Sequence, residues 1–185
     1  LGWDGMDQLG ATEQLLQQAL EIYERHAPNS LEVANTLYSL GDVALSRGDL
    51  SGAERLYQQV LAIQEKLAPN SLQTAATLSA LGTVAYTRGD IARAERLYRQ
   101  ALAIREKLAP NSLEVARTLY SLGHVAYARG DLSGAEQLYQ QALAIQEKLA
   151  PNSLEVARTL HSLGNVAYTR GDIARAERLY RQALA

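Results

Sequence analysis

Arginine, tyrosine and histidine side chains recur at three positions that return along the chain every 41 residues. Arginine and tyrosine often carry binding energy at protein interfaces. The three positions are offset by three and seven residues, so they share one side of a helix, roughly opposite Leu37, Leu40 and Ala44. The pattern therefore predicts a recognition surface. Its residues are Asn35, Ala76, Arg117 and Arg158 at the first position, Tyr38, Ser79, Tyr120 and His161 at the second, and Asp42, Thr83, His124 and Asn165 at the third.

Free drift of solvent-facing positions is the alternative explanation for this variable stripe. The recognition hypothesis is favoured because the stripe is rich in side chains suited to binding. Tyr86, Tyr127 and Tyr168 follow it in the later copies, and Arg117 and Arg158 concentrate near the C-terminal end. Because charge-assisted contacts to arginine are strong, acidic or aromatic peptides are the expected guests.

The sequence gives little support for a metal site, a catalytic site or a nucleic-acid-binding site. His124 and His161 make a poor metal site without cysteine or a paired carboxylate. No nucleophile motif, phosphate loop or metal motif is present, so we expect neither an enzyme nor a cofactor. Arginines between residues 93 and 99 interleave with Glu95, which favours a solvated face over a nucleic-acid track.

Composition excludes several classes of partner. The formal net charge is −2, whereas binders of nucleic acid or anionic membranes present a basic face. There is no cysteine, no apolar run long enough to span a membrane and no signal-peptide pattern, and we expect a cytoplasmic protein. A start at Leu1 and an end within a repeat at Ala185 are typical of an excised or engineered fragment.

The elements that carry these residues form a tandem array. The tetrapeptide Ala-Pro-Asn-Ser recurs at 27–30, 68–71, 109–112 and 150–153, and periods of this size indicate a solenoid. In the first copy, Asn29 or Ser30 can cap a helix that ends at Gly48, and Glu32 stands at the capping-box offset from Asn29. Asp49 caps a second helix that stops before Pro69. Each repeat is thus predicted to be a helical hairpin.

A glycine within the first helix of every repeat predicts close contact between the two helices. Interior glycine costs about 1 kcal/mol relative to alanine, so tight packing must compensate. In the first repeat Gly41 has Ala53 as its small partner and Tyr57 as its large one. The corresponding tyrosines are predicted to lie in the core.

Leu37, Leu40-Gly41, Ala53, Tyr57 and Val60-Leu61 fall at the spacings of the tetratricopeptide repeat, and the resemblance covers residues 11–185. The unit is longer than the standard form. The long form is similar to repeats of kinesin light chain and of bacterial proteins with a caspase-like CHAT domain, although no such domain is present. The resemblance implies an all-α fold, an α-α superhelix: a right-handed solenoid of antiparallel hairpins whose first helices line a concave peptide groove.

The family's carboxylate clamp, built from lysines and asparagines on the first helices, is not matched. Only Asn165 fits, so a chaperone-tail binder is not expected. Two functions stay open: a non-catalytic scaffold for a peptide or protein partner, and a purely structural or engineered array without a dedicated ligand. The third and fourth repeats are expected to dominate any binding.

The predicted organisation has six parts. They are an N-terminal segment or engineering remnant at 1–10, a half-repeat at 11–28, and repeats at 29–69, 70–110, 111–151 and 152–185, the last truncated. Residues 84–103 and 166–185 are identical, which indicates duplication of a two-repeat block. Apolar residues at both ends, including Leu179 and Leu184, predict weak end-to-end self-association.

Overall fold

A computed structural model describes residues 3–184 of the chain, and the side chains from Gln8 onward. Within these residues the regular structure is entirely helical. The chain divides into two compact units, Leu1–Asp90 and Ile91–Ala185. The boundary falls between two helices, at the turn after Gly89.

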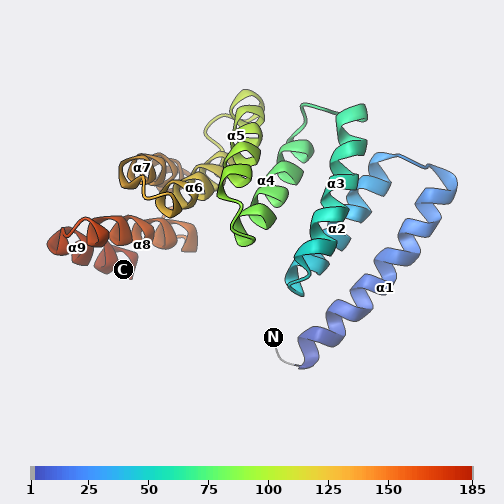
Figure 1. Ribbon diagram of the computed structural model, residues 1–185, viewed down its shortest axis with the longest axis horizontal. Helices are drawn as coiled ribbons and strands as arrows, with labels where there is room; N and C mark the ends of the chain where they lie inside the picture. Colours follow the sequence, from blue (N-terminus) through green and yellow to red (C-terminus); the bar gives the residue numbers. More distant parts are fainter. Residues whose placement is uncertain (1–2, 185) are drawn as a thin grey trace. The chain divides into compact units, whose positions relative to one another are not determined.

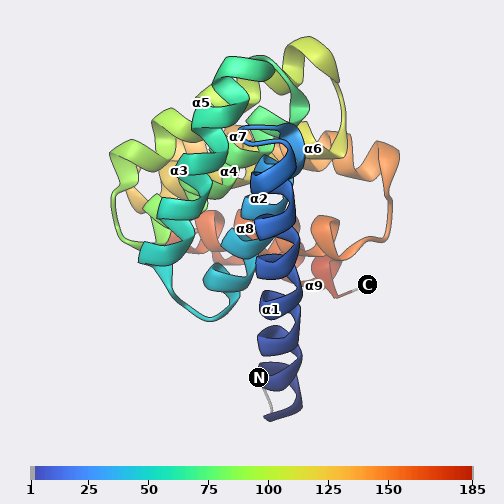
Figure 2. The same cartoon turned by 90° about the vertical axis from the view of Figure 1, so that its right-hand side faces the viewer.

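The first unit contains α1 (Trp3–His26), α2 (Leu31–Ser46), α3 (Leu50–Leu67) and α4 (Leu72–Thr87), and each helix packs against the next (Figure 1). Helix α1 runs beside α2, and its N-terminal turns extend past the end of α2 (Figure 2). The segment expected at residues 1–10 therefore belongs to α1 from Trp3 onward. The side chain of Trp3 lies outside the described residues.

The second unit contains α5 (Ile91–Leu108), α6 (Leu113–Ala128), α7 (Leu132–Leu149), α8 (Leu154–Thr169) and α9 (Ile173–Ala183). Again each helix packs against its neighbour in sequence, and α6 with α7 forms a hairpin like that of α2 with α3. The starts of α2, α4, α6 and α8 keep the spacing of the sequence repeat. We call these four the first helices, and α1, α3, α5, α7 and α9 the second helices.

Serine caps the first helices. The Ser30 side chain accepts a hydrogen bond from the backbone N–H of Val33, and Ser71, Ser112 and Ser153 do the same in later repeats. Asn29 is not the cap, so the capping box expected from its offset to Glu32 does not form there. Asn29 instead has φ of 58°, a left-handed conformation that asparagine tolerates better than most residues.

The turn within each hairpin ends as the sequence predicts. Gly48 has φ of 79°, and this left-handed conformation closes α2 without the steric penalty of a side chain. Asp49 then caps α3, where its carboxylate accepts a hydrogen bond from the N–H of Gly52 at 2.9 Å. Together these residues reverse the chain within three positions.

The core repeats along the chain. Val33, Ala34, Leu37 and Val60 form a buried cluster in the first unit, and Val115, Ala116, Leu119 and Ala142 form its equivalent in the second. The predicted contact at glycine is confirmed, because a Cβ added to Gly41 would lie 2.5 Å from Cε1 of Tyr57. Tyr57 and Tyr139 are almost completely buried, as predicted, whereas Tyr180 in the last repeat is only half-buried.

Ion pairs join four of the second helices, α1, α3, α5 and α7, to the first helix that follows each of them. The arginine that ends the first helix reaches a glutamate on the preceding second helix, and both partners keep their places from repeat to repeat. The pairs are Arg47 with Glu13, Arg88 with Glu54, Arg129 with Glu95 and Arg170 with Glu136. Glu136 also pairs with Arg175 of α9.

Candidate functional site

Three of the predicted recognition residues meet at one hollow in the second unit. The hollow has a volume of about 140 Å³ and lies between α6, α7 and α8. Arg117 and Tyr120 of α6 stand on one side and Arg158 of α8 on the other. Glu155, Gln146 and Thr159 complete the lining. The exposed side of the first helices, which we call the first-helix face, is therefore concave at this point.

The two arginines of this hollow are available to a ligand. The Arg117 side chain is 62% exposed, and its Nη2 lies 3.8 Å from Oε1 of Glu155, which is too long for a strong charge-assisted hydrogen bond. Arg158 is also exposed and makes no ion pair with the residues that the structure describes. A carboxylate entering the hollow would meet two guanidinium groups.

The floor of the hollow is polar but internally satisfied. Gln146 is 2% exposed, and its Oε1 accepts a hydrogen bond of 2.8 Å from Oγ1 of the fully buried Thr159. In the preceding repeat Arg105 donates to Thr118 at the corresponding positions. Sequence reasoning missed this buried polar position. The signal was present, because Gln146 follows Ala142 by four residues on the apolar side of α7.

Tyr120 and His124 form an aromatic cluster with the core tyrosine Tyr139. The ring of His124 lies 4.6 Å from that of Tyr120 and 5.5 Å from that of Tyr139, both edge to face. Burial lowers the pKa of His124, because the charged imidazolium is poorly solvated there. Tyr120 also accepts a hydrogen bond of 3.3 Å from Ser162 of α8. His124 is thus half-buried beside the hollow rather than free on its surface.

Two other predicted residues accept hydrogen bonds from tyrosines of the second helices. The hydroxyl of Tyr57 donates to Oδ1 of Asp42, and the hydroxyl of Tyr180 donates to Oδ1 of Asn165. Sequence reasoning had given Asp42 and Asn165 only a surface role. Tyrosine is long enough for its hydroxyl to cross the hairpin and reach the first-helix face. The position of Asp42 and Asn165 must therefore supply an acceptor for this hydroxyl.

The remaining predicted residues lie along the same helices. His161 is exposed, with its ring 5.3 Å from that of Tyr180. Tyr127 shares a 2.8 Å hydrogen bond with Thr169. Tyr168 is 62% exposed, and Tyr86 is half-buried at the end of α4. These tyrosines lie at the C-terminal ends of their helices, and none of them lines the hollow.

The first unit contains the same hollow without charges. It has a volume of about 260 Å³ and is lined by Asn35, Tyr38, Ser39, Gln64, Gln73 and Ala76. Asn35 and Ala76 stand where the second unit has Arg117 and Arg158. The ring of Tyr38 lies 5.3 Å from that of Tyr57. The same part of the repeat thus forms a charged hollow in the second unit and an uncharged hollow in the first.

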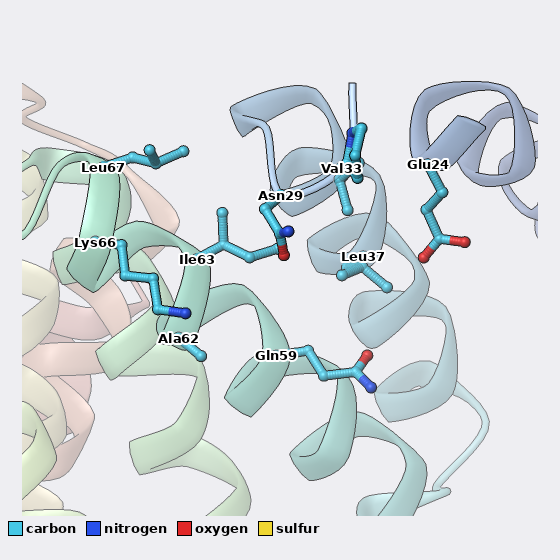
Figure 3. A pocket seen from close by; sticks show the side chains of 10 residues that line it. Glu24, Asn29, Val33, Leu37, Gln59, Ala62, Ile63, Lys66 and Leu67 are labelled. Atoms are coloured by element: carbon cyan, nitrogen blue, oxygen red, sulfur yellow. The ribbon is translucent and has the colours of Figure 1, made fainter. Parts of the chain in front are cut away.

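A larger hollow opens on the side of the second helices in the first unit. It has a volume of about 470 Å³ and lies between α1, α2 and α3. Figure 3 shows Lys66 and Gln59 of α3 extending toward α2, on which Leu37 lies. None of the predicted recognition residues lines it. A second hollow of about 470 Å³, between α5, α6 and α7, has Glu95, Arg99 and Arg129 at its edge.

The described residues hold no group of three or more side chains suited to a metal ion. Within the same part of the chain, no helix is both long and apolar enough to cross a membrane.

Comparison with known proteins identifies solved structures with a similar fold. No curated protein sequence matches the chain closely enough to count as a relative. Among solved structures it is similar to BtubC (BKLC) from P. vanneervenii, with 22% identity and a TM-score of 0.88 over 97% of this chain and 73% of that one. A Podosopora anserina protein described as a kinesin light chain with nearly identical TPR-like repeats matches with 22% identity and a TM-score of 0.78, over 98% of this chain and 88% of that one.

A Rap protein complexed with Competence and Sporulation Factor also matches, with 19% identity and a TM-score of 0.80 over 97% of this chain and 49% of that one. The all-α fold of repeated helix hairpins is confirmed, and the P. anserina structure that it resembles is described as having TPR-like repeats. The family model for the tetratricopeptide repeat matches residues 5–66, 53–107 and 114–185. The chain belongs to the tetratricopeptide repeat family.

Proposed function

We propose that this chain is a non-catalytic protein-interaction scaffold, and that the hollow of the second unit binds an acidic side chain of a partner's peptide segment. Tetratricopeptide repeats typically serve as such scaffolds. The observation that carries the proposal is the pair of exposed arginines, Arg117 and Arg158, on opposite sides of one hollow. The solved complex of a Rap protein with Competence and Sporulation Factor supports the idea that such repeats bind other molecules.

The chemistry of the hollow favours a carboxylate. A guanidinium group presents a planar fork of donors that matches a carboxylate, and charge-assisted bonds of this kind are roughly twice as strong as neutral ones. Glu155 offsets only part of the positive charge, because it lies 3.8 Å from Arg117 and does not pair with Arg158. Tyr120 adds an aromatic wall that can cover the apolar part of the same side chain.

Selection from a library of short random peptides tests this function, with the binding of selected peptides then measured by calorimetry. Wild-type protein should enrich peptides that contain aspartate or glutamate. Arg117→Ala with Arg158→Ala should weaken them more than about tenfold, since two charge-assisted contacts exceed the 1.4 kcal/mol that corresponds to this factor. Asn35→Ala, at the position of Arg117 in the first unit, is the matched control and should leave the acidic preference intact.

Affinity should also fall as salt is raised, because exposed charges are screened. Unchanged affinity in the double variant would move the site elsewhere. A wild-type protein that selects no peptide at all would instead favour an array without a dedicated ligand.

A further inference from the structure

We propose that the uncharged hollow of the first unit is a second subsite, which binds the side-chain amide of an asparagine or glutamine in a bound peptide. This proposal rests on the proposed function, because it requires that the first-helix face binds peptides. It adds a site of different chemistry, and a separate set of residues determines its preference.

The lining of this hollow is polar and uncharged. Asn35, Tyr38 and Ser39 come from α2, Gln64 from α3, and Gln73 and Ala76 from α4. At neutral pH none of these side chains carries a charge. The volume of about 260 Å³ exceeds the 140 Å³ of the charged hollow, where Arg158 replaces the small Ala76. A side chain of moderate size has room to enter.

Gln64 provides the independent sign of a missing partner. It is 3% exposed, and its Oε1 has no hydrogen-bond partner among the residues that the structure describes. Buried side-chain oxygens are nearly always hydrogen-bonded, so an unpartnered one beside a hollow is unusual. Rotation about the last bond of a glutamine side chain is soft, and this freedom allows the amide to present either atom to a guest.

The equivalent residue of the second unit shows what Gln64 lacks. There Oγ1 of Thr159 lies within hydrogen-bond distance of Oε1 of Gln146, at 2.8 Å, and of the backbone oxygen of Glu155, at 2.9 Å. In the first unit Thr77 keeps the backbone contact, with the oxygen of Gln73 at 3.2 Å. The side-chain oxygen of Gln64, however, is buried and unpaired.

Among possible guests, an amide fits best. A charged guest would lose its hydration and meet no opposite charge in the lining. An apolar guest would cover Gln64 and leave its polar atoms unpaired, which is unfavourable in a buried setting. A primary amide has both a donor and an acceptor, as glutamine and asparagine themselves do, so it can satisfy Gln64 and Asn35 together.

The same selection of random peptides, analysed by position, tests the subsite with matched variants. Gln64→Leu removes the amide at similar volume, and Gln58→Leu makes the same change at an exposed position of α3 that lines neither hollow. Asn35→Arg with Ala76→Arg gives the first hollow the arginines of the second. Wild-type protein and Gln58→Leu should enrich asparagine or glutamine at one position. Gln64→Leu and the double arginine variant should lose that enrichment, and the latter should gain a preference for acidic residues.

Calorimetry with one selected peptide gives the second readout. Replacing its asparagine or glutamine by leucine should weaken binding to wild type about threefold to tenfold, as for loss of one neutral hydrogen bond, and should have little effect on binding to Gln64→Leu. Should Gln64→Leu fail to fold, the double arginine variant decides, because its two substitutions lie at exposed or partly exposed positions.

Enrichment of acidic residues without enrichment of amides in the wild type would overturn the subsite and leave the proposed function standing. Amide enrichment that survives in both Gln64→Leu and the double arginine variant would also overturn it. If wild-type protein selects no peptide, the proposed function fails and the subsite fails with it.

Discussion

The hydroxyl of Tyr57 on α3 donates a hydrogen bond of 2.6 Å to Oδ1 of Asp42 on α2. The hydroxyl of Tyr180 makes the same contact with Asn165, at 2.8 Å, in the last repeat. Burial raises the pKa of Tyr57, and its hydrogen bond to Asp42 raises it further, so the hydroxyl stays protonated and acts as the donor. The third position of the recognition stripe therefore also supports the core.

Asp42→Ala should destabilise the first unit by about 1–3 kcal/mol, because it leaves the buried Tyr57 hydroxyl without its acceptor. Asp42→Asn, which copies the fourth repeat, keeps an oxygen acceptor and should cost much less. Adding Tyr57→Phe to Asp42→Ala should recover part of the loss, since the orphaned hydroxyl is then absent. Urea unfolding of the three variants measures these differences. Equal stability of Asp42→Ala and wild type would show that the contact contributes nothing.

Gly41→Ala should destabilise the protein by about 1–3 kcal/mol, in spite of the better helix propensity of alanine. The added Cβ would lie 2.5 Å from the ring of Tyr57, which is itself held in the core. Gly10→Ala in α1 is the control, because its Cβ would lie 3.8 Å from the nearest group, Arg47, and should stabilise or leave the helix unchanged. Thermal unfolding compares the two. A stabilising Gly41→Ala would mean that Tyr57 moves aside at no cost.

Glu136→Gln should lower stability by about 1 kcal/mol or less, the range of partly exposed ion pairs, and high salt should reduce the difference. Burial raises the pKa of Glu136, but hydrogen bonds and charges of Arg175 and Arg170 outweigh it and hold that pKa below the usual value of 4.5. This contribution is present above pH 4.5 and is lost as the pH falls through the lower pKa of the folded state.

Glu177 is the control for Glu136. It stands at the same position one repeat later and pairs with Arg181 of its own helix, where both side chains are largely exposed. Glu177→Gln should change stability little, because exposed ion pairs contribute little. A loss of stability as large as that of Glu136→Gln would show that an ion pair between neighbouring repeats stabilises the protein no more than one within a single helix. Urea unfolding between neutral and acidic pH distinguishes the cases.

Much of the fold follows from local signals in the sequence. Ser30, Gly48 and Asp49 set the ends of the helices through short-range hydrogen bonds and a left-handed turn, and repetition shows each signal several times. Asn29 was the harder case, because asparagine suits both a cap and a left-handed residue. The backbone conformation decides whether Asn29 caps the helix or takes the left-handed conformation, and the sequence alone does not show that conformation.

The candidate site was less predictable because it depends on partners distant in sequence. Helical spacing placed Arg117, Tyr120 and Arg158 on one face, and the structure brings them around one hollow. Spacing does not show that a tyrosine hydroxyl crosses the hairpin to Asp42. Nor does it show that the side chain of Gln64 is buried without a partner for its oxygen. Both depend on side-chain length and direction, which a periodic pattern does not record.

His124 should make the stability of the second unit depend on pH. Its pKa is lowered from 6.5 because it is buried against Tyr120 and Tyr139, so the unfolded chain binds the proton more tightly than the folded one. The contribution of neutral His124 is therefore complete above the unfolded pKa and is lost as the pH falls. Between about pH 7.5 and pH 5.5, where histidine titrates, wild type should lose more stability than His124→Asn, which copies Asn165 of the fourth repeat.

Unfolding by urea at a series of pH values measures this difference. The stability of His124→Asn should depend on pH with a shallower slope than that of the wild type. The proton on His124 can also be followed directly by the chemical shift of its ring in nuclear magnetic resonance. A midpoint above 6.5 would reverse the sign of the effect, because a partner would then favour the charged ring and stability would increase on acidification.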